Sequence, residues 1–187
     1  MSALELPHVP YADYLARERI AERKSEYLRG AIYAMSGGTP EHARLASRMA
    51  YVLNRALEDR ACVVFSSDLR VRILATNRST YPDLTVVCGP RETAPDDPDA
   101  VTNPTLIVEV LSDSTEADDR GDKFAHYRHL ASLQTYVLVT QKTPRIEVFH
   151  REGERWVLTS HGPGTTVDLP ALDVSIRVDD VYRDPTA

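Results

Sequence analysis

The sequence predicts an α/β (α+β) fold in which helices flank a mixed β-sheet and the chain ends in an antiparallel meander. Three observations predict it. Short apolar runs rich in β-branched residues recur along the chain, as is typical of buried strands. Two longer segments carry apolar residues at helical spacing, one before these strands and one between them. The 187 residues contain no repeat and no linker long enough to divide the chain, so we expect one domain over residues 1–187.

The composition is that of a globular protein, with 42% hydrophobic and 27% charged residues. The chain has no long apolar span and no basic-then-apolar N-terminus, so we expect neither a membrane helix nor a signal peptide. The net charge of −6 argues against a protein that coats nucleic acid, although it does not exclude a nuclease with carboxylates in its site. Cys62 and Cys88 lie in apolar runs and are interpreted as free buried thiols of a reducing compartment, which predicts a cytoplasmic location.

The N-terminal part is expected to form a helix and then a hairpin. Tyr11, Tyr14, Leu15 and Ile20 are compatible with a short packing helix after Pro10. Residues 26–35 then alternate as two short strands around a turn at Arg29-Gly30.

A second helix is predicted from Thr39 to about Glu58. Gly37-Gly38 is read as a flexible break before it, and Thr39-Pro40-Glu41 supplies an N-cap, a helix-compatible proline and a first-turn acid. One face of this helix is apolar and also carries His42, which therefore points inward from the first turn. The residues of that face are His42, Ala46, Met49, Ala50, Leu53 and Leu57.

Three strands are predicted next, over residues 61–65, 69–74 and 81–88, with Asp68 as a turn residue. In the second strand apolar residues alternate with Arg70 and Arg72, which is the pattern of a strand with one face in water. Together with Arg78 they are read as a basic, solvated stripe beside Asp83. The acidic and proline-rich residues 91–102 are expected to be a mobile surface loop.

The rest of the chain predicts a strand, a helix and four further strands. Residues 106–111 form an apolar run, the helix starts near Ser114 or Thr115 and runs to about Leu130, and residues 134–140 form a central strand. Residues 146–149, 155–158 and 174–176 are expected to form the terminal meander.

Two acids stand in the apolar strands, Glu109 within one and Asp83 at the head of another. An unpaired buried carboxylate is costly, so something must compensate it. One divalent cation held between the two acids explains both. The other reading is structural, with Asp83 as a strand-end acid and Glu109 as a core acid paired with Arg72 or Lys123.

The predicted helix at residues 115–130 supplies the remaining candidates. Arg120, Phe124, Tyr127 and Ala131 share its buried face, and Lys123 lies at the flank, where it can reach the end of the preceding strand. Asp122, His126 and His129 face water on the other side. Their spacing could suggest zinc, but no cysteine or further histidine completes such a site, so we reject it.

These residues carry a family resemblance. Residues 103–112, followed by Asp119-Arg120-Gly121-Asp122-Lys123-Phe124 and Tyr127, resemble the Uma-two family, which is grouped with the restriction-endonuclease-like PD-(D/E)XK nucleases. The same family is resembled by three further features: Tyr81-Pro82-Asp83, the hairpin from Glu26 to Gly30, and His42 at the start of its helix. The resemblance covers roughly residues 20–160 with the motifs in order.

The resemblance implies a restriction-endonuclease-like mixed sheet and a divalent-metal site in which Asp83 and Glu109 bind the metal. Leu111 stands where the pattern places its lysine, two residues after the acid, so Lys123 on the following helix is the candidate substitute. Asp113 stands where the family often has proline. We add the carbonyl of Val110 as the expected third ligand of the metal.

Several of these residues keep a second reading. Lys123 could be a surface lysine paired with Asp119 one turn earlier. Glu26 is either a ligand of the metal or its water, or an exposed hairpin acid, and His42 is either a ligand or a capping or core histidine. Tyr127 is expected in the core with its hydroxyl near the site, and Arg120 is expected to pair with a site acid or touch phosphate.

We therefore expect a hydrolase, a Mg²⁺- or Mn²⁺-dependent DNA endonuclease with Asp83, Glu109 and Lys123 as its catalytic residues. By analogy with such enzymes we expect a homodimer acting on nucleic acid, with no membrane partner. The alternative is a binding or assembly module that keeps the nuclease fold without turnover. The acidic net charge and the displaced lysine favour that alternative.

Overall fold

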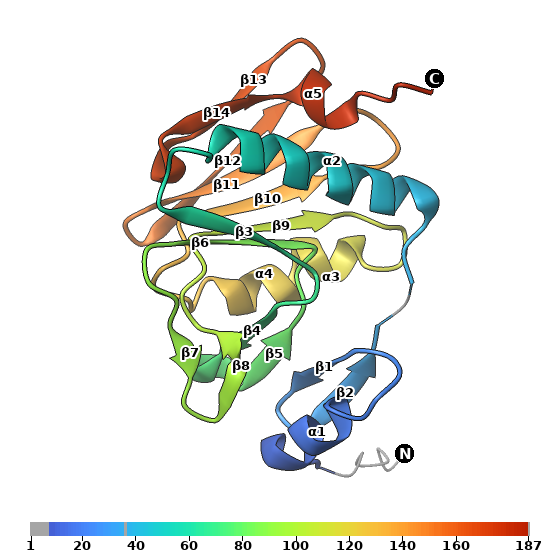
Figure 1. Ribbon diagram of the computed structural model, residues 1–187, viewed down its shortest axis with the longest axis vertical. Helices are drawn as coiled ribbons and strands as arrows, with labels where there is room; N and C mark the ends of the chain where they lie inside the picture. Colours follow the sequence, from blue (N-terminus) through green and yellow to red (C-terminus); the bar gives the residue numbers. More distant parts are fainter. Residues whose placement is uncertain (1–7, 36, 187) are drawn as a thin grey trace.

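The computed structural model describes residues 8–35 and 37–186, and it contains two six-stranded sheets with helices packed on them (Figure 1). The central sheet is mixed, because β9 and β10 run parallel while its other neighbours are antiparallel. In spatial order its strands are β12 (Arg155–His161), β11 (Ile146–Glu152), β10 (Thr135–Val139), β9 (Leu106–Val110), β6 (Leu84–Cys88) and β3 (Cys62–Ser66). A mixed sheet flanked by helices is confirmed.

One face of the central sheet is covered by α2 (Pro40–Ala56), whose Thr39 N-cap side chain accepts a hydrogen bond from the backbone N–H of His42. The apolar stripe of α2 packs on alternate residues of the strands, among them Val108 and Val110 of β9. A separate hairpin and a short C-terminal helix lie on the same side (Figure 1). They are β13 (Thr166–Leu169), β14 (Val174–Arg177) and α5 (Val178–Tyr182), with the 3₁₀ turn η2 (Pro170–Leu172) between the two strands.

The other face of the central sheet packs against α3 (Glu116–Arg120) and α4 (Asp122–Tyr127) (Figure 1). Because side chains alternate along an extended chain, Ile107 and Glu109 of β9 and Leu111 directly after it share this side, and Ile107 and Leu111 belong to its apolar core. Phe124 stacks on Tyr136 of β10 with ring centroids 4.9 Å apart. The carboxylate of Glu109 is thus directed towards the helix that carries Lys123.

The second sheet, which we call the N-terminal sheet, is built mainly from residues that precede β9. In spatial order it comprises β2 (Ala31–Ala34), β1 (Ser25–Leu28), β5 (Arg78–Thr80), β4 (Arg70–Ile73), β8 (Asp97–Val101) and β7 (Thr93–Ala94), with the turn η1 (Leu74–Thr76) between β4 and β5. Tyr14 of α1 (Tyr11–Glu18) packs on Tyr27 of β1. This sheet lies below α3 and α4 in Figure 1, which places those helices between it and the central sheet.

Three local predictions are wrong. The single helix expected over residues 115–130 is interrupted at Gly121, which separates α3 from α4. Residues 91–102 contain the strand pair β7–β8 where a mobile loop was expected. The last predicted strand, β14, pairs with β13 and is not a member of the meander formed by β10, β11 and β12.

The basic stripe is also not solvated, because the N-terminal sheet buries it. Each of its arginines is paired with an acid: Arg70 with Asp97 (2.8 Å), Arg72 with Asp96 (2.9 Å) and Arg78 with Glu26 (3.3 Å). The side chains of β4 therefore alternate between two buried environments. Val71 and Ile73 face the apolar core, and Arg70 and Arg72 face the ion pairs.

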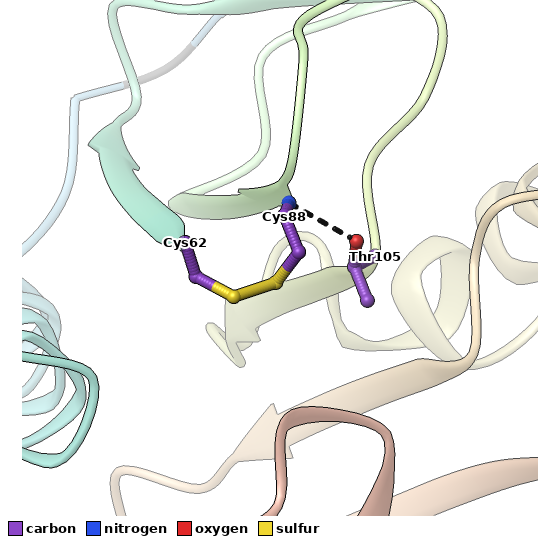
Figure 2. Close-up of a disulfide and its surroundings, with 3 residues drawn as sticks. All are labelled: Cys62, Cys88 and Thr105. Carbon is purple, nitrogen blue, oxygen red and sulfur yellow. Dashed lines mark hydrogen bonds between the residues drawn. A yellow bond between two sulfur atoms is a disulfide. The ribbon is translucent and has the colours of Figure 1, made fainter. Parts of the chain in front are cut away.

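Cys62 and Cys88 form a disulfide, so the prediction of free thiols is wrong (Figure 2). The two residues are direct partners in the antiparallel register of β3 and β6, with Cα atoms 4.0 Å apart. The backbone N–H of Cys88 also donates to the Thr105 hydroxyl over 3.3 Å (Figure 2). The expected cytoplasmic location is therefore no longer supported by free thiols, and it stays a prediction.

No helix among the described residues is long and apolar enough to cross a membrane.

Candidate active site

A cleft of about 800 Å³ opens where the two sheets meet the start of α2. Its walls come from segments that are far apart in sequence: Glu26, residues within 33–35 and 37–42, Tyr81 with Asp83, residues between Glu109 and Lys123, and the loop from Thr140 to Arg145. Asp83, Glu109 and Lys123 lie along it, together with Glu26, His42 and Arg120. The structure therefore brings most of the predicted site residues into one cavity.

Asp83 and Glu109 are neighbours because β6 and β9 pair antiparallel with Leu84 opposite Val108. This register sets Asp83, just before β6, beside Glu109. Each carboxylate accepts a hydrogen bond from the backbone of the opposite segment. Asp83 N–H donates to Glu109 Oε2 (3.3 Å), and Val110 N–H donates to Asp83 Oδ2 (2.7 Å). The two carboxylates are therefore held together before any ligand binds.

Lys123 points from α4 into this pair of acids. Its Nζ lies 3.0 Å from Glu109 Oε1, 3.2 Å from Asp119 Oδ1 and 3.6 Å from Glu26 Oε1. The pairing with Asp119 that the surface reading anticipated is present, but Lys123 is buried, with a side chain only 10% exposed. Burial lowers the pKa of Lys123, yet Glu109, Glu26 and Asp119 together raise it well above its usual value, so the ammonium group stays charged.

Glu26 is not the exposed hairpin acid of its second reading. β1 pairs with β5, and this pairing buries the carboxylate against residues that follow β4. Its Oε1 accepts from the hydroxyl of Thr80, and its Oε2 lies 3.3 Å from Arg78. Burial raises the pKa of Glu26, but the attraction of Lys123 and the contacts with Thr80 and Arg78 outweigh it, so the net shift is downward.

Negative charge is in excess at this site. Among the described residues, four buried or half-buried carboxylates, those of Glu26, Asp83, Glu109 and Asp119, lie together with two permanently charged side chains, Lys123 and Arg78, and Arg78 is also shared with Asp118. Acidic groups therefore outnumber the permanent positive charges. Burial raises the pKa of Glu109 to about 8, and the nearby charges of Asp119 and Asp83 add to that effect against the attraction of Lys123. Such a cluster of carboxylates attracts either a proton or a metal cation.

His42 is one of the groups that face Asp83, since its Nε2 lies 3.2 Å from Asp83 Oδ2. The hydrogen bond to Asp83 raises the pKa of His42 against the lowering effect of burial. The ring also lies against Gly38: a Cβ at that position would be 2.9 Å from His42 Nδ1. The first turn of α2 thus delivers the imidazole to the site, as its inward-facing position predicts.

The helix residues differ in how they reach the site. The Tyr127 hydroxyl donates to Glu109 Oε1 over 2.8 Å from a fully buried ring, in the place expected for it. Arg120 lines the cleft and pairs with Glu116 (2.8 Å) and Glu147 instead of the candidate acids Asp83, Glu109 and Glu26, so that pairing is wrong, while its expected contact with phosphate stays a prediction. The break at Gly121 is the reason, because it takes Arg120 off the stripe that Phe124 and Tyr127 share.

The donor set suits a hard cation of the Mg²⁺ type. Asp83 and Glu109 each offer carboxylate oxygen, and Mg²⁺ is usually held by one or two carboxylates with water completing its shell. Within residues 8–35 and 37–186 no three acidic, histidine or cysteine side chains surround one metal position, which does not suit zinc. Asp122, His126 and His129 accordingly form no metal site in that part of the chain.

Two residues of the cluster were missed by reasoning from the sequence. Asp119 entered only as a surface partner of Lys123, although Asp119, Lys123 and Tyr127 recur at four-residue intervals, which was a usable signal. Arg78 was assigned to a solvated stripe, and its role beside Glu26 depends on the β1–β5 pairing, which no local pattern announces.

Comparisons with known proteins agree with this architecture. The "uncharacterized protein slr1290" of Synechocystis sp. (strain ATCC 27184 / PCC 6803 / Kazusa) is 35% identical over 178 residues, covering 95% of this chain and 93% of the relative. The "uncharacterized protein sll1609" of the same organism is 38% identical over 149 residues, covering 79% and 84%.

A crystal structure of "a putative nuclease belonging to DUF820" from Anabaena variabilis ATCC 29413 superposes with a TM-score of 0.73 at 18% identity, covering 91% of this chain and 96% of that one, which shows a shared fold. Residues 11–179 match the Uma2 family, described as "putative restriction endonuclease". The match is wider than the resemblance seen in the motifs and includes every candidate residue of the cleft. The chain therefore belongs to the Uma2 family, with the fold of restriction-endonuclease-like proteins.

Proposed function

We propose that this protein is a metal-dependent endonuclease that hydrolyses phosphodiester bonds of DNA. The observation that carries the proposal is the cluster of four carboxylates, those of Glu26, Asp83, Glu109 and Asp119, which outnumber the permanently charged Lys123 and Arg78 beside them. A divalent cation offsets that excess. Membership of a family of nuclease-like proteins supports the same reaction class.

Asp83 and Glu109 would hold Mg²⁺ or Mn²⁺, with the Val110 carbonyl as a further ligand. When bound, the ion would lower the pKa of a water molecule and offset charge on the phosphate. The polypeptide fixes the two carboxylates through the hydrogen bonds Asp83 N–H to Glu109 and Val110 N–H to Asp83. Little reorganisation of these side chains is then needed for binding.

Lys123 replaces the lysine that the family pattern places at Leu111. Its ammonium group, 3.0 Å from Glu109, can donate to the attacking water or to a phosphate oxygen, and an electrostatic contact of this kind acts most strongly in a site that excludes water. Tyr127 orients Glu109 from the other side, and Glu26 and His42 complete the surround.

The substrate and assembly follow from the reaction class. A phosphodiesterase of this family would act on nucleic acid, and we propose DNA. A homodimer would allow both strands to be cut, and a cytoplasmic location would give access to that substrate.

A second candidate is a binding or assembly module that keeps the nuclease fold without turnover. It is favoured by the lining of the cleft, where eight carboxylates face four lysine or arginine side chains, a balance that repels a polyanion. In this case the acids would bind a cation for stability only.

Nicking of supercoiled plasmid DNA with Mn²⁺ separates the two candidates. The wild-type protein should nick, and Glu109→Gln and Lys123→Met should not, while Asp122→Asn, an exposed acid-to-amide change on the same helix, should cut like wild type. Melting curves with and without Mn²⁺ accompany each assay, because a cation that binds only the folded state raises the melting temperature. A wild-type protein that is stabilised by Mn²⁺ without nicking supports the second candidate. Absence of both effects overturns both.

A further inference from the structure

Asp119 is an unusual residue for its helix. The five-residue α3 carries three acids, and its neighbour Asp118 is 49% exposed, whereas the side chain of Asp119 is 3% exposed. A carboxylate removed from water in this way needs a cation close by. Among the residues that the structure describes, the cation within ion-pair distance is Lys123, 3.2 Å away.

The three acids around Lys123 differ in the other groups that contact them. Glu26 is also held by Arg78 at 3.3 Å, and Glu109 also accepts from Tyr127 and from the Asp83 backbone. Asp119 has Lys123 as its one cationic partner in the described part of the chain. Lys123 is thus shared by three carboxylates, and among the described residues it is the one ion-pair partner of both Glu109 and Asp119, although Asp119 also accepts a hydrogen bond from the Thr115 side chain.

Binding of a divalent cation would change this balance. Glu109 would direct its charge to the cation, and the cation would repel the ammonium group of Lys123 at close range. Glu26 also attracts Lys123, but its carboxylate lies 3.6 Å away and is shared with Arg78, whereas Asp119 lies 3.2 Å away and accepts a hydrogen bond from the ammonium group. Asp119 is then the nearest remaining carboxylate that can keep Lys123 in the cleft.

The backbone of Asp119 is fixed in a way that suits this task. Its carbonyl accepts a hydrogen bond of 2.9 Å from the hydroxyl of Tyr136, which is fully buried in β10 of the central sheet. Gly121 separates Asp119 on α3 from Lys123 on α4, so their ion pair also ties the two short helices together. The carboxylate is therefore anchored to the same sheet that carries Glu109.

We propose that Asp119 is a positioning residue, which holds the Lys123 ammonium group beside Glu109 while Glu109 shares its charge with a divalent cation. The catalytic part of this proposal rests on the proposed function. The position of the Lys123 side chain can be measured without any DNA cleavage. Asp119 is not assigned as a ligand of the cation, and the test separates the two roles.

The test compares wild type with Asp119→Asn, which keeps the shape and removes the charge, and with Asp122→Asn as the matched control. Lys123 is labelled with a small amine-reactive reagent at saturating Mn²⁺, and the modification is quantified by mass spectrometry. We expect Lys123 to react roughly tenfold faster in Asp119→Asn than in the other two proteins. Asp119→Glu, which restores the charge, should protect Lys123 again.

Calorimetric titration with Mn²⁺ gives the second readout. A positioning role predicts that Asp119→Asn binds Mn²⁺ within a fewfold of wild type, whereas loss of a ligand would weaken binding far more. In nicking assays kcat should fall roughly 10–100-fold with KM little changed. The change should have no further effect in a Lys123→Met background, because Asp119 acts through Lys123.

The proposal is overturned if Lys123 is labelled at the same rate in Asp119→Asn and wild type, or if Asp119→Asn loses Mn²⁺ binding. A wild-type protein that never nicks DNA would instead remove the proposed function, and the labelling result would still decide whether Asp119 places Lys123. Melting curves establish that each variant is folded at the temperature of labelling.

Discussion

The Nε2 atom of His42 lies 3.2 Å from Oδ2 of Asp83, so the first turn of α2 is joined to a proposed metal ligand that stands just before β6. This contact offers a probe of cation binding that needs no substrate. The hydrogen bond to Asp83 raises the pKa of His42 above its usual value. Saturating Mg²⁺ should lower that pKa, because a cation that shares Asp83 repels the imidazolium form.

The measurement is an NMR titration of the imidazole signals with and without Mg²⁺. Asp83→Asn provides the control, since it should lower the His42 pKa by itself and abolish the response to Mg²⁺. A pKa that Mg²⁺ leaves unchanged in the wild type would argue against a cation at Asp83.

Metal binding should strengthen with pH, because of Glu109. Its pKa is raised from 4.5 to about 8, so between these values the folded protein holds a proton that the unfolded chain has lost. Metal-free stability should therefore fall as pH rises through this window. A cation replaces the proton, so the rise in melting temperature caused by Mn²⁺ should be larger at about pH 8.5 than at about pH 6.5.

Glu109→Gln tests whether Glu109 is the source of this pH dependence. The variant should show a flatter pH profile and little response to Mn²⁺ at either pH. If the wild-type response to Mn²⁺ were the same across the whole window, the raised pKa of Glu109 could not be linked to the metal.

The disulfide should contribute to stability but not to the site. Cys62 and Cys88 close a loop of 26 residues and attach the edge strand β3 to β6, and Cys88 lies at the opposite end of β6 from Asp83. Replacing both with serine should reduce the free energy of unfolding by about 2–4 kcal/mol, as measured by urea denaturation. The Mn²⁺ affinity should match that of wild type, and a large loss of affinity would show that the two ends of β6 are coupled.

The buried pair Arg70–Asp97 should stabilise the N-terminal sheet. Its atoms are 2.8 Å apart and the Asp97 side chain has no solvent exposure. Burial raises the pKa of Asp97, but the hydrogen bonds from Arg70 and Tyr11 outweigh it and lower the pKa below its usual value. The pair therefore contributes fully above the unfolded pKa of about 3.9, and this stability is lost as the pH falls through the folded pKa.

Asp97→Asn should reduce the free energy of unfolding at neutral pH by roughly 3–5 kcal/mol, because it leaves a buried guanidinium without its charge partner. The difference from wild type should shrink below about pH 3 in acid titrations of stability. A difference that stays constant down to low pH would assign the effect to packing.

The sequence predicted the parts of the site that depend on a single strand or helix. Apolar runs located β6 and β9, and the acids set into them identified Asp83 and Glu109. The first-turn position of His42 showed that it points inward. These inferences succeed because burial and periodicity are local properties of the chain.

The remaining parts depend on pairings between distant strands. Glu26 is buried because β1 pairs with β5, 52 residues away at Arg78. The cysteines bond because β3 and β6 place them opposite each other, and the arginines of β4 are hidden because acids from the β7–β8 region cover them. Arg120 was misplaced by one irregularity, the helix break at Gly121.

The proposed site requires one cation shared by Asp83 and Glu109, and anomalous diffraction from crystals soaked in Mn²⁺ would locate that cation. We predict a single strong anomalous peak between the two carboxylates, with Lys123 still in contact with Asp119. A map without that peak at saturating Mn²⁺, or with its peak away from both acids, would rule out a cation shared by Asp83 and Glu109.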